Sequence, residues 1–506
     1  MLAFEMLLAI LLGAAVLAML AKRIGVPYPV LLALMGMAIS LIPGLPKLDL
    51  PPDLILALLV APVLLDAAHD MSLRDLRRNW RPIFSLVVVA VGLTTVAVAF
   101  TVRWFLPDMP WAAAIALGAL LAPPDAVAAI AIMRQVEPPH RIRMVLEGES
   151  LLNDASSLLI YRFAVASVAT GSFHARDAVP ALILVAVGSV AAGWVLAILI
   201  GHLIRRVDDA AISIVLQFVM TFGVWLLAEQ LHLSAVITVV AFGLTAARAP
   251  TSAMPTPVRV NAFATWETVT FVLNVLAFVL IGLQLRPILP TIAGGQHMNW
   301  LSMAAACLAV VIVIRFVWVF SYRFFFPDDP GRPDAVTKQE SFKGGLVIGW
   351  SGMRGIVTLA AALALPDAFP YRDFILVTAF VVVLGTLLIQ GLTLRPLLKW
   401  LKMPHDNVVE KEILLARTKA LKAALGGLAN QEGQAAQRLR QEYEAALAGA
   451  KAASDSSAIT DNVLRRQIVK HARGAIDVLR DSGQIGDDAY RRVEQELDWL
   501  ELSTHR

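Results

Sequence analysis

The sequence predicts an all-α polytopic membrane protein with about 13 transmembrane helices and a C-terminal helical tail. Hydrophobic residues make up 58% of its 506 residues. The mean hydropathy of +0.70 indicates more apolar surface than a soluble domain requires. Apolar segments recur at close to the ~20 residues that a spanning helix needs. Lys and Arg are concentrated in every second loop, as in a chain that crosses a membrane repeatedly.

Thirteen apolar segments account for the first four-fifths of the chain. They cover residues 2–21, 27–43, 53–70, 82–104, 110–133, 142–170, 178–204, 209–231, 234–249, 262–285, 300–325, 344–366 and 373–398. The first is followed by Lys22 and Arg23, whereas a cleavable signal peptide has its positive charges before the apolar stretch. We therefore expect the first segment to be a retained span.

The composition changes after Lys402. Residues 1–402 form the expected transmembrane domain, and residues 403–506 are charged and rich in alanine. Helices are expected in this tail near 407–427, 435–452, 461–480 and 487–501. The tail is interpreted as a cytoplasmic appendage with either a stabilising or a regulatory role.

Lys and Arg concentrate in the loops that follow odd-numbered segments. They are Lys22, Arg23, Arg74, Arg77, Arg78, Arg81, Arg134, Arg141, Arg143, Arg205, Arg206, Arg248, Arg259, Arg332, Lys338 and Lys343. The opposite loops hold little beyond Lys47, Arg176, Arg286 and Arg372. Because cytoplasmic loops carry the excess of basic residues, we expect the N-terminus outside and the C-terminus in the cytoplasm.

Two segments are expected to be broken helices. In the fifth, Pro123 and Pro124 remove two amide donors and clash with the preceding turn, so a new helix should begin at Asp125. In the twelfth, five glycines and a serine surround Arg354, which favours a second interruption. Segments five and twelve are seven apart and cross in opposite directions. Broken helices at matching places in inverted repeats indicate a transporter's midplane site.

The sixth segment reads as one membrane helix that carries acidic side chains. Hydrocarbon disfavours Glu149 and Asp154 by roughly 2.5 kcal/mol or more each, so both indicate a functional or paired position. Helical spacing places Ser150, Asn153, Asp154 and Ser157 on one face. Glu149 lies about 140° around the helix from Asp154. The two carboxylates should therefore serve different partners.

Asp154 and Asp125 are the main candidates for chemistry. Removal from water disfavours a charged carboxylate, so each can hold either a proton or a cation, and one excludes the other. Hard oxygen ligands suit alkali cations. Ser150 offers a hydroxyl, and the broken backbone at Pro123 and Pro124 offers carbonyls. The alternative is that Asp154 is a buried structural acid bonded to a neighbouring helix.

Other charged groups within the segments need partners. Arg354 cannot deprotonate in practice, so we expect Glu149 to form an ion pair with it; the alternative is that Arg354 binds a substrate anion. Asp66 could gate the cytoplasmic route, pair with a basic residue or contact the transported ion. Structural pairing is expected for most of Arg162, Glu267, Asn274 and Arg315.

Several classes of protein are disfavoured. The sequence contains no Walker motif, dinucleotide fingerprint or paired-cysteine site, which argues against a primary pump or a redox carrier. Its single cysteine, Cys307, excludes a disulfide framework. A net charge of +4 gives no reason to expect a nucleic-acid partner. No cofactor is expected.

At these residues the chain resembles a sodium/proton antiporter of the cation:proton antiporter-1 family, the bacterial relatives of the sodium/hydrogen exchangers. The resemblance covers all thirteen segments and is weakest in the tail. Its motifs are Glu147–Asp154, Pro123–Ala128, Trp350–Gly355 and Leu64–Ala67.

The resemblance implies a homodimer in the bacterial inner membrane, with a dimer domain and a core that moves like an elevator. Segments five and twelve would cross, unwound, within that core. It implies cation ligands from Asp154, Asp125, Ser150 and the Pro124 backbone carbonyl. Asn153 is similar to the electroneutral branch, which exchanges one cation for one proton. Many members have threonine at the position of Pro124, so the sodium-versus-potassium preference stays open.

We therefore predict electroneutral exchange of sodium or lithium for protons by a secondary transporter, which is not an enzyme. Potassium/proton exchange is the alternative within the family. A cation channel, an anion transporter that uses Arg354, and a sensor that signals through the tail are alternatives from other classes. The substrates would be sodium and protons, and the tail's partner is unknown.

Overall fold

The chain is described here by a computed structural model. The residues that it describes are 2–43, 51–133, 136, 138–170, 175–204, 206–248, 256–293, 298–326, 338–403, 406–452, 471–479, 482, 484, 493 and 496–497. Arg134, Arg205, Arg332, Lys47 and the side chain of Arg176 lie outside the described residues, as do most of the two last helices expected in the tail.

The described residues form α-helices, two π-helical stretches and no β-strand, which confirms the all-α class. Each of the thirteen apolar segments contains helix. The first six segments and the loops between them give α1 Leu2–Ile24, α2 Tyr28–Ser40, α3 Pro52–Ile55, η1 Leu56–Val60, α4 Ala61–Asp70, α5 Leu73–Arg78, α6 Trp80–Phe84, η2 Ser85–Ala90, α7 Val91–Phe105, α8 Trp111–Leu121, α9 Ala126–Met133 and α10 His140–Thr170. The remaining seven give α11 Ala175–Ile204, α12 Ala210–Gln230, α13 Ala235–Ala246, α14 Thr256–Leu283, α15 Leu285–Ala293, α16 Met298–Phe325, α17 Lys338–Trp350, α18 Ile356–Leu363 and α19 Arg372–Leu401.

Six of the described helices are long and apolar enough to cross a membrane. They are Trp80–Phe105, Pro180–Ile204, Ala210–Gln230, Val258–Pro290, Asn299–Phe325 and Arg372–Leu401. Three shorter apolar helices, α2, α8 and α13, accompany them. The chain is thus a multi-pass membrane protein, while the count of thirteen crossings stays a prediction.

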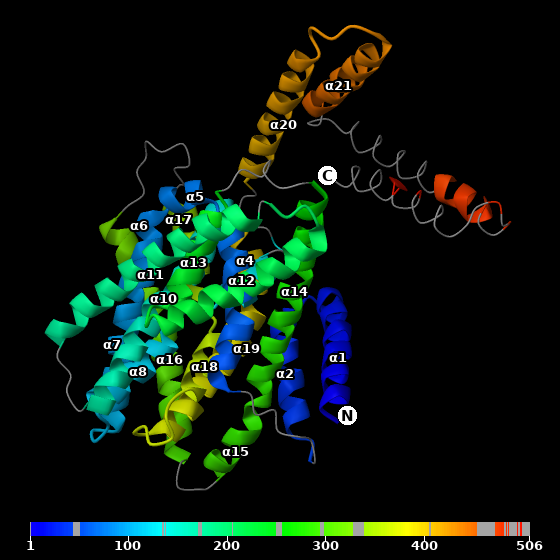
Figure 1. Cartoon of the computed structure of the whole chain (residues 1–506). Helices are drawn as coiled ribbons and strands as arrows, with labels where there is room; N and C mark the ends of the chain where they lie inside the picture. Colours follow the sequence, from blue (N-terminus) through cyan, green and yellow to red (C-terminus); the bar gives the residue numbers. More distant parts are fainter. Residues whose placement is uncertain are drawn as a thin grey trace. The chain divides into compact units, whose positions relative to one another are not determined.

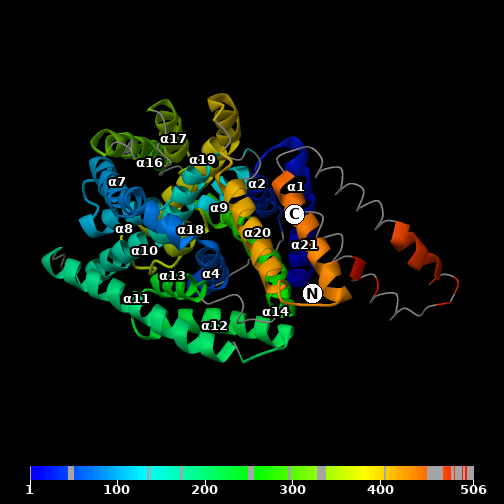
Figure 2. The ribbon, with the colours of Figure 1, turned by 90° about the horizontal axis from the view of Figure 1, so that it is seen from above.

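The chain divides into two compact units, Met1–His405 and Asp406–Arg506. In the first unit, α11, α12 and α13 lie along one side, and α7, α16, α17 and α19 lie toward the opposite side (Figures 1 and 2). Helices α10, α18 and α4 lie between these groups (Figure 2). The second unit contains α20 Val408–Gly427 and α21 Gln434–Ala452, which pack on each other and confirm two of the expected tail helices.

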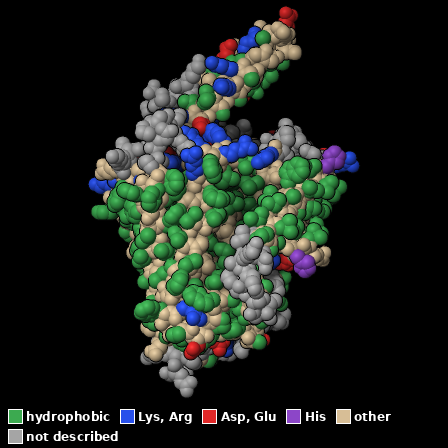
Figure 3. Space-filling view, turned by 90° about the vertical axis from the view of Figure 1, so that its left-hand side faces the viewer, with side chains coloured by type: hydrophobic (Ala, Val, Ile, Leu, Met, Phe, Trp, Pro, Cys, Tyr) green, Lys and Arg blue, Asp and Glu red, His purple; other side chains and the backbone are tan. Residues whose placement is uncertain are grey.

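The surface of the first unit is largely apolar, as contact with the hydrocarbon of a bilayer requires. Large apolar side chains face outward, among them Trp104, Leu184 and Phe324, each at least 74% exposed. Hydrophobic side chains cover most of the face in Figure 3, and a band of Lys and Arg gathers at the end where α5 and the start of α17 lie (Figures 1 and 3). Lipid can therefore cover the apolar surface while the basic band stays in water.

Glycines let α2 and α14 touch backbone to backbone. A Cβ atom added at Gly36 would lie 2.2 Å from the Val279 carbonyl oxygen, and one added at Gly282 would lie 2.1 Å from that of Ala33. Small residues permit this close approach between membrane helices. The contact fixes α14 directly against α2.

Candidate cation site at the crossing of two broken helices

Both expected breaks are present. Helix α8 ends at Leu121 and α9 begins at Ala126, while α17 ends at Trp350 and α18 begins at Ile356. The two non-helical stretches meet where the Asp125 amide donates to the Met353 carbonyl at 2.6 Å. The prolines cannot donate helical hydrogen bonds and the glycines weaken a helix, so both stretches are disfavoured from continuing as α-helix. Two segments separated by more than 200 residues therefore share one backbone hydrogen bond.

Arg354 satisfies the end of the first broken helix. Its Nε donates to the Leu121 carbonyl at 2.9 Å and its Nη2 to the Ala122 carbonyl at 3.2 Å; Nη1 donates to the carbonyl of Gly352. The last carbonyls of a helix have no intrahelical donors and carry partial negative charge. Arg354 is 1% exposed, so these carbonyls take the place of water around the guanidinium.

The predicted partner of Glu149 was wrong. The structure pairs Glu149 with Arg315 of α16, whose Nη1 and Nη2 donate to Oε1 and Oε2 at 2.5 and 2.8 Å. Arg354 lines the same small pocket as this pair, but each of its three guanidinium nitrogens donates to a backbone carbonyl. Helical spacing correctly turned Glu149 away from Asp154, yet it could not choose between two arginines on different helices.

Asn153 holds the non-helical stretch between α8 and α9 in place. Its Nδ2 donates to the Pro124 carbonyl at 2.7 Å, and the side chain is fully buried. Pro124 lines the small pocket with Glu149 and Arg315, whereas Pro123 lines the large cavity described below. The carbonyl expected to bind a cation is therefore engaged by Asn153, and a ligand role for Pro124 stays a prediction without a supporting contact.

Asp125 sits at the start of α9, as expected. Its Oδ1 accepts from the Val127 amide at 2.8 Å, which caps the helix. Its Oδ2 lies against Gly355, where an added Cβ atom would come within 1.8 Å. The positive end of the α9 dipole and the absence of a side chain at Gly355 together fit a carboxylate at this position.

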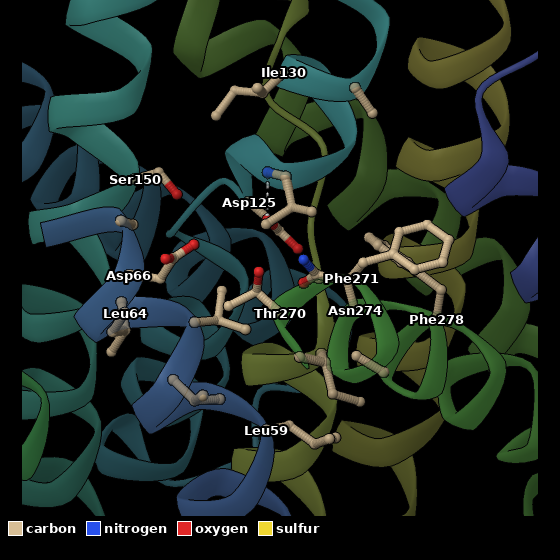
Figure 4. A pocket seen from close by; sticks show the side chains of 18 of the residues that line it. Leu59, Leu64, Asp66, Asp125, Ile130, Ser150, Thr270, Phe271, Asn274 and Phe278 are labelled. Carbon is tan, nitrogen blue, oxygen red and sulfur yellow. Dashed lines mark hydrogen bonds between the residues drawn. The ribbon is translucent and has the colours of Figure 1, made fainter. Parts of the chain in front are cut away.

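A cavity of about 1190 Å³ brings most of the predicted ligands together. Asp125, Asp154, Ser150 and Asp66 all line it. Figure 4 shows Asp66 and Ser150 on one side of the cavity, with Asp125 in the middle of the view. The cavity is also lined by Lys22, Asp70 and Arg143, near the end of α1, at the end of α4 and near the start of α10. It therefore joins the crossing of the broken helices to the basic end of the unit.

The carboxylate of Asp154 faces the cavity without a bonding partner among the described residues. No hydrogen bond or ion pair joins this side chain to any residue that the structure describes, while Ser150 and Asp66 each have a further interaction. The alternative of a structural acid bonded to a neighbouring helix thus has no contact to support it. A carboxylate that faces a cavity without a partner is able to bind a proton or a cation.

Sequence reasoning missed a polar stripe on α14. Glu267, Thr270 and Asn274 line the cavity, although structural pairing was expected for Glu267 and Asn274. Their spacing of three and four residues is the signal that could have identified one shared face. Arg315 and Arg162 are paired, the latter with Glu229 at 3.6 Å.

The side chains around the cavity do not resemble a binding site for a resident transition metal. Among the described residues no group of three or more His, Cys, Asp or Glu side chains could hold a metal ion. Two carboxylates with hydroxyl and amide oxygens instead suit a hard cation.

A family model described as the transmembrane sodium/hydrogen exchanger matches residues 7–400. The chain belongs to the sodium/hydrogen exchanger family. The family consists of cation/proton antiporters, which are transporters rather than enzymes. The match covers the whole of the part that contains the broken helices and the cavity.

Relatives of this exchanger extend over most of its length. It is 32% identical to an uncharacterized Na+/H+ exchanger of Mycobacterium tuberculosis, covering 99% of this chain and 96% of that protein. It is 31% identical to a sodium, potassium, lithium and rubidium/H+ antiporter of Bacillus pumilus, covering 79% and 62%. It is 31% identical to the low-affinity Na+/H+ antiporter NhaS1 of Synechocystis, covering 80% and 75%.

The fold of the exchanger is similar to that of a solved antiporter structure. The solved structure of the sodium proton antiporter MjNhaP1 from Methanocaldococcus jannaschii matches with a TM-score of 0.59 at 19% identity. The match covers 79% of this chain and 98% of that chain. This similarity identifies the fold.

Proposed function

We propose that this exchanger moves Na+ or Li+ in one direction and H+ in the other, one for one, across a bacterial inner membrane. Asp154 and Asp125 hold the cation and the proton alternately. The observation that carries the proposal is that both carboxylates line one cavity at the crossing of two broken helices. Because proton and cation compete for the same oxygens, binding of one releases the other.

Alternating access requires the site to face each side in turn. The cavity joins Asp125 to residues at the basic end of the membrane unit, and the excess of Lys and Arg marks the cytoplasmic side. This conformation is therefore assigned as inward-facing, with the N-terminus outside and the C-terminus in the cytoplasm. A core that contains α8, α9, α17 and α18 would carry the site outward by an elevator motion.

Electroneutral exchange is supported by the neutral side chain at Asn153. When a proton replaces a monovalent cation, one positive charge leaves the site and one enters it, so the charge of the site is the same in both loaded states. The Glu149–Arg315 pair is already matched and takes no part in the exchange. The role of Asp66, which lines the cavity, is to attract or gate cations on the cytoplasmic route.

Potassium/proton exchange is the alternative that a comparison supports. The relative from Bacillus pumilus is named for sodium, potassium, lithium and rubidium. An anion transporter based on Arg354 has less support, because the guanidinium donates to three backbone carbonyls and does not line the large cavity. A cation channel predicts sodium flux without a proton flux in the opposite direction, and this distinguishes it from an exchanger.

The substrates of the proposal are the cation and the proton, and no resident cofactor is required. We propose a homodimer embedded in lipid, without nucleic acid, and assign no partner to the tail.

The test is exchange in everted vesicles that carry a respiration-driven proton gradient, followed by a fluorescent pH probe. Addition of NaCl or LiCl should restore the fluorescence, and KCl should do so weakly. Clamping the membrane potential with valinomycin and potassium should leave the sodium response unchanged. Sodium flux without proton movement would indicate a channel, and an equal or larger response to KCl would assign the potassium alternative.

A further inference from the structure

Asn274 occupies an unusual place for a carboxamide. It lies at the midpoint of the membrane-length helix Val258–Pro290, where a polar group needs a partner. Its side chain makes no hydrogen bond with any residue that the structure describes. The neighbouring Thr270 differs, because its hydroxyl donates to the Trp266 carbonyl at 2.8 Å within the same helix.

The amide faces the exchange site. Asn274 lines the same cavity as Asp125 and Asp154, and Figure 4 shows its side chain pointing toward Asp125. No hydrogen bond joins these two side chains, and both line the cavity. A group that points toward a carboxylate in a shared cavity is placed to contact whatever that carboxylate binds.

The position of Asn274 does not depend on the broken helices. Its helix, α14, is fixed to α2 by the backbone contact at Gly36 and Gly282. The amide is thus presented to the site by a rigid neighbour, whereas Asp125 is held by the crossing with Met353.

We propose that Asn274 is a ligand of the transported cation and helps to set cation selectivity. Rotation about the Cβ–Cγ bond presents the amide oxygen to a cation bound by Asp125 and Asp154, or the amide nitrogen to an empty carboxylate. An uncharged oxygen adds a ligand without changing the charge balance between cation and proton. Its effect therefore falls on cation affinity and on the size of ion that fits. The proposal rests on the exchange function proposed above.

The test compares Asn274→Leu with Thr265→Val in proteoliposomes, with apparent KM measured for Na+, Li+ and K+. Asn274→Leu should raise the KM for Na+ by about tenfold, the worth of one lost polar contact to a charge, with the maximal rate within about twofold. Thr265→Val should leave the KM unchanged, because Thr265 lies on the same helix outside the cavity lining and its hydroxyl donates to the Asn261 carbonyl at 2.8 Å. Asn274→Gln should recover part of the affinity and alter the ratio of KM values for Na+ and Li+.

A second readout does not depend on transport. Na+ should raise the melting temperature of the purified wild-type protein and of Thr265→Val, and Asn274→Leu should need about tenfold more Na+ for the same shift. If Asn274→Leu does not fold, Asn274→Ala and Asn274→Ser serve in its place, and the serine variant should keep more affinity. An unchanged KM with a reduced maximal rate would mean a packing role and overturn the assignment. Absence of exchange by the wild type would instead overturn the proposed function.

Discussion

Arg315 and Glu149 are joined by two parallel hydrogen bonds of 2.5 and 2.8 Å, with both side chains at most 4% exposed. The Nε of Arg315 also donates to the Ile348 carbonyl at 3.0 Å. This pair ties α10 to α16 and to the helix that leads into the second break. Its strength rests on the bidentate geometry, since a buried charge is stable when it is paired and hydrogen-bonded.

Removal of one partner of this pair should be costly. Arg315→Met leaves the Glu149 charge buried and unpaired, so we expect a loss of about 3–5 kcal/mol in stability, and the double variant with Glu149→Leu should recover most of it. Arg162→Met, which breaks a half-exposed pair with Glu229, should cost at most about 1 kcal/mol. Melting temperatures of the purified variants decide between these outcomes; losses that simply add in the double variant would argue against a direct pair.

Gly355 should tolerate no side chain. Gly355→Ala would place a Cβ atom 1.8 Å from the Asp125 Oδ2, so Asp125 or the crossing must move, and exchange should fall at least about tenfold. Gly223→Ala is the matched control, because an added Cβ atom there meets nothing within 4 Å. Rates of sodium-driven proton release measure both variants. Full activity in Gly355→Ala would show that the observed packing of Asp125 is not needed.

Asn153→Asp should destabilise the site rather than simply add a second acid. The Asn153 amide donates to the Pro124 carbonyl, whereas an ionised aspartate has no proton to donate and would face that carbonyl in a buried position. We expect a loss of about 1–3 kcal/mol in stability, together with reduced exchange. Asn153→Ala separates loss of the bond from the added repulsion, and it should be the milder change. A variant as stable as the wild type would contradict this account of Asn153.

The breaks in the fold were predictable because their cause is local. Pro123 and Pro124 cannot donate, and the glycines around Arg354 give a helix little support, so the sequence alone located both interruptions. Asp125 at a new helix start follows from the same reasoning. The cavity residues Asp154 and Ser150, four apart on α10, follow from helical periodicity.

The partners across helices were not predictable in this way. Glu149 had two candidate arginines, and the choice of Arg315 depends on where α16 and the break at Ser351–Gly355 lie in space. The carbonyls left at the end of α8 attract Arg354, a demand that becomes visible once α8 is known to end at Leu121. Asn274 was expected to be paired, because its lack of a partner is a property of the packed cavity.

Asp75 should give the basic end of the membrane unit a stability that depends on pH. Burial raises the pKa of Asp75, but hydrogen bonds from His140 and Ser72 and the charge of Arg74 outweigh it, so its pKa is lowered from 3.8. A lowered folded-state pKa stabilises the protein above the unfolded pKa, and this contribution is lost as the pH falls through the folded value. Wild type should therefore melt above Asp75→Asn at pH 7, and the gap should close below the folded pKa. A gap that is the same at low pH would exclude this linkage.

Competition between sodium and protons at Asp154 and Asp125 is tested most directly by the pH dependence of the apparent KM for Na+. In proteoliposomes that contain the wild-type exchanger, the KM should rise about tenfold for each pH unit at acidic pH, where a single proton occupies the site, while the maximal rate at saturating Na+ stays constant. Asp154→Asn should abolish exchange at every pH. A KM that does not change with pH while the maximal rate falls, or full exchange by Asp154→Asn, would contradict a shared site for the two ions.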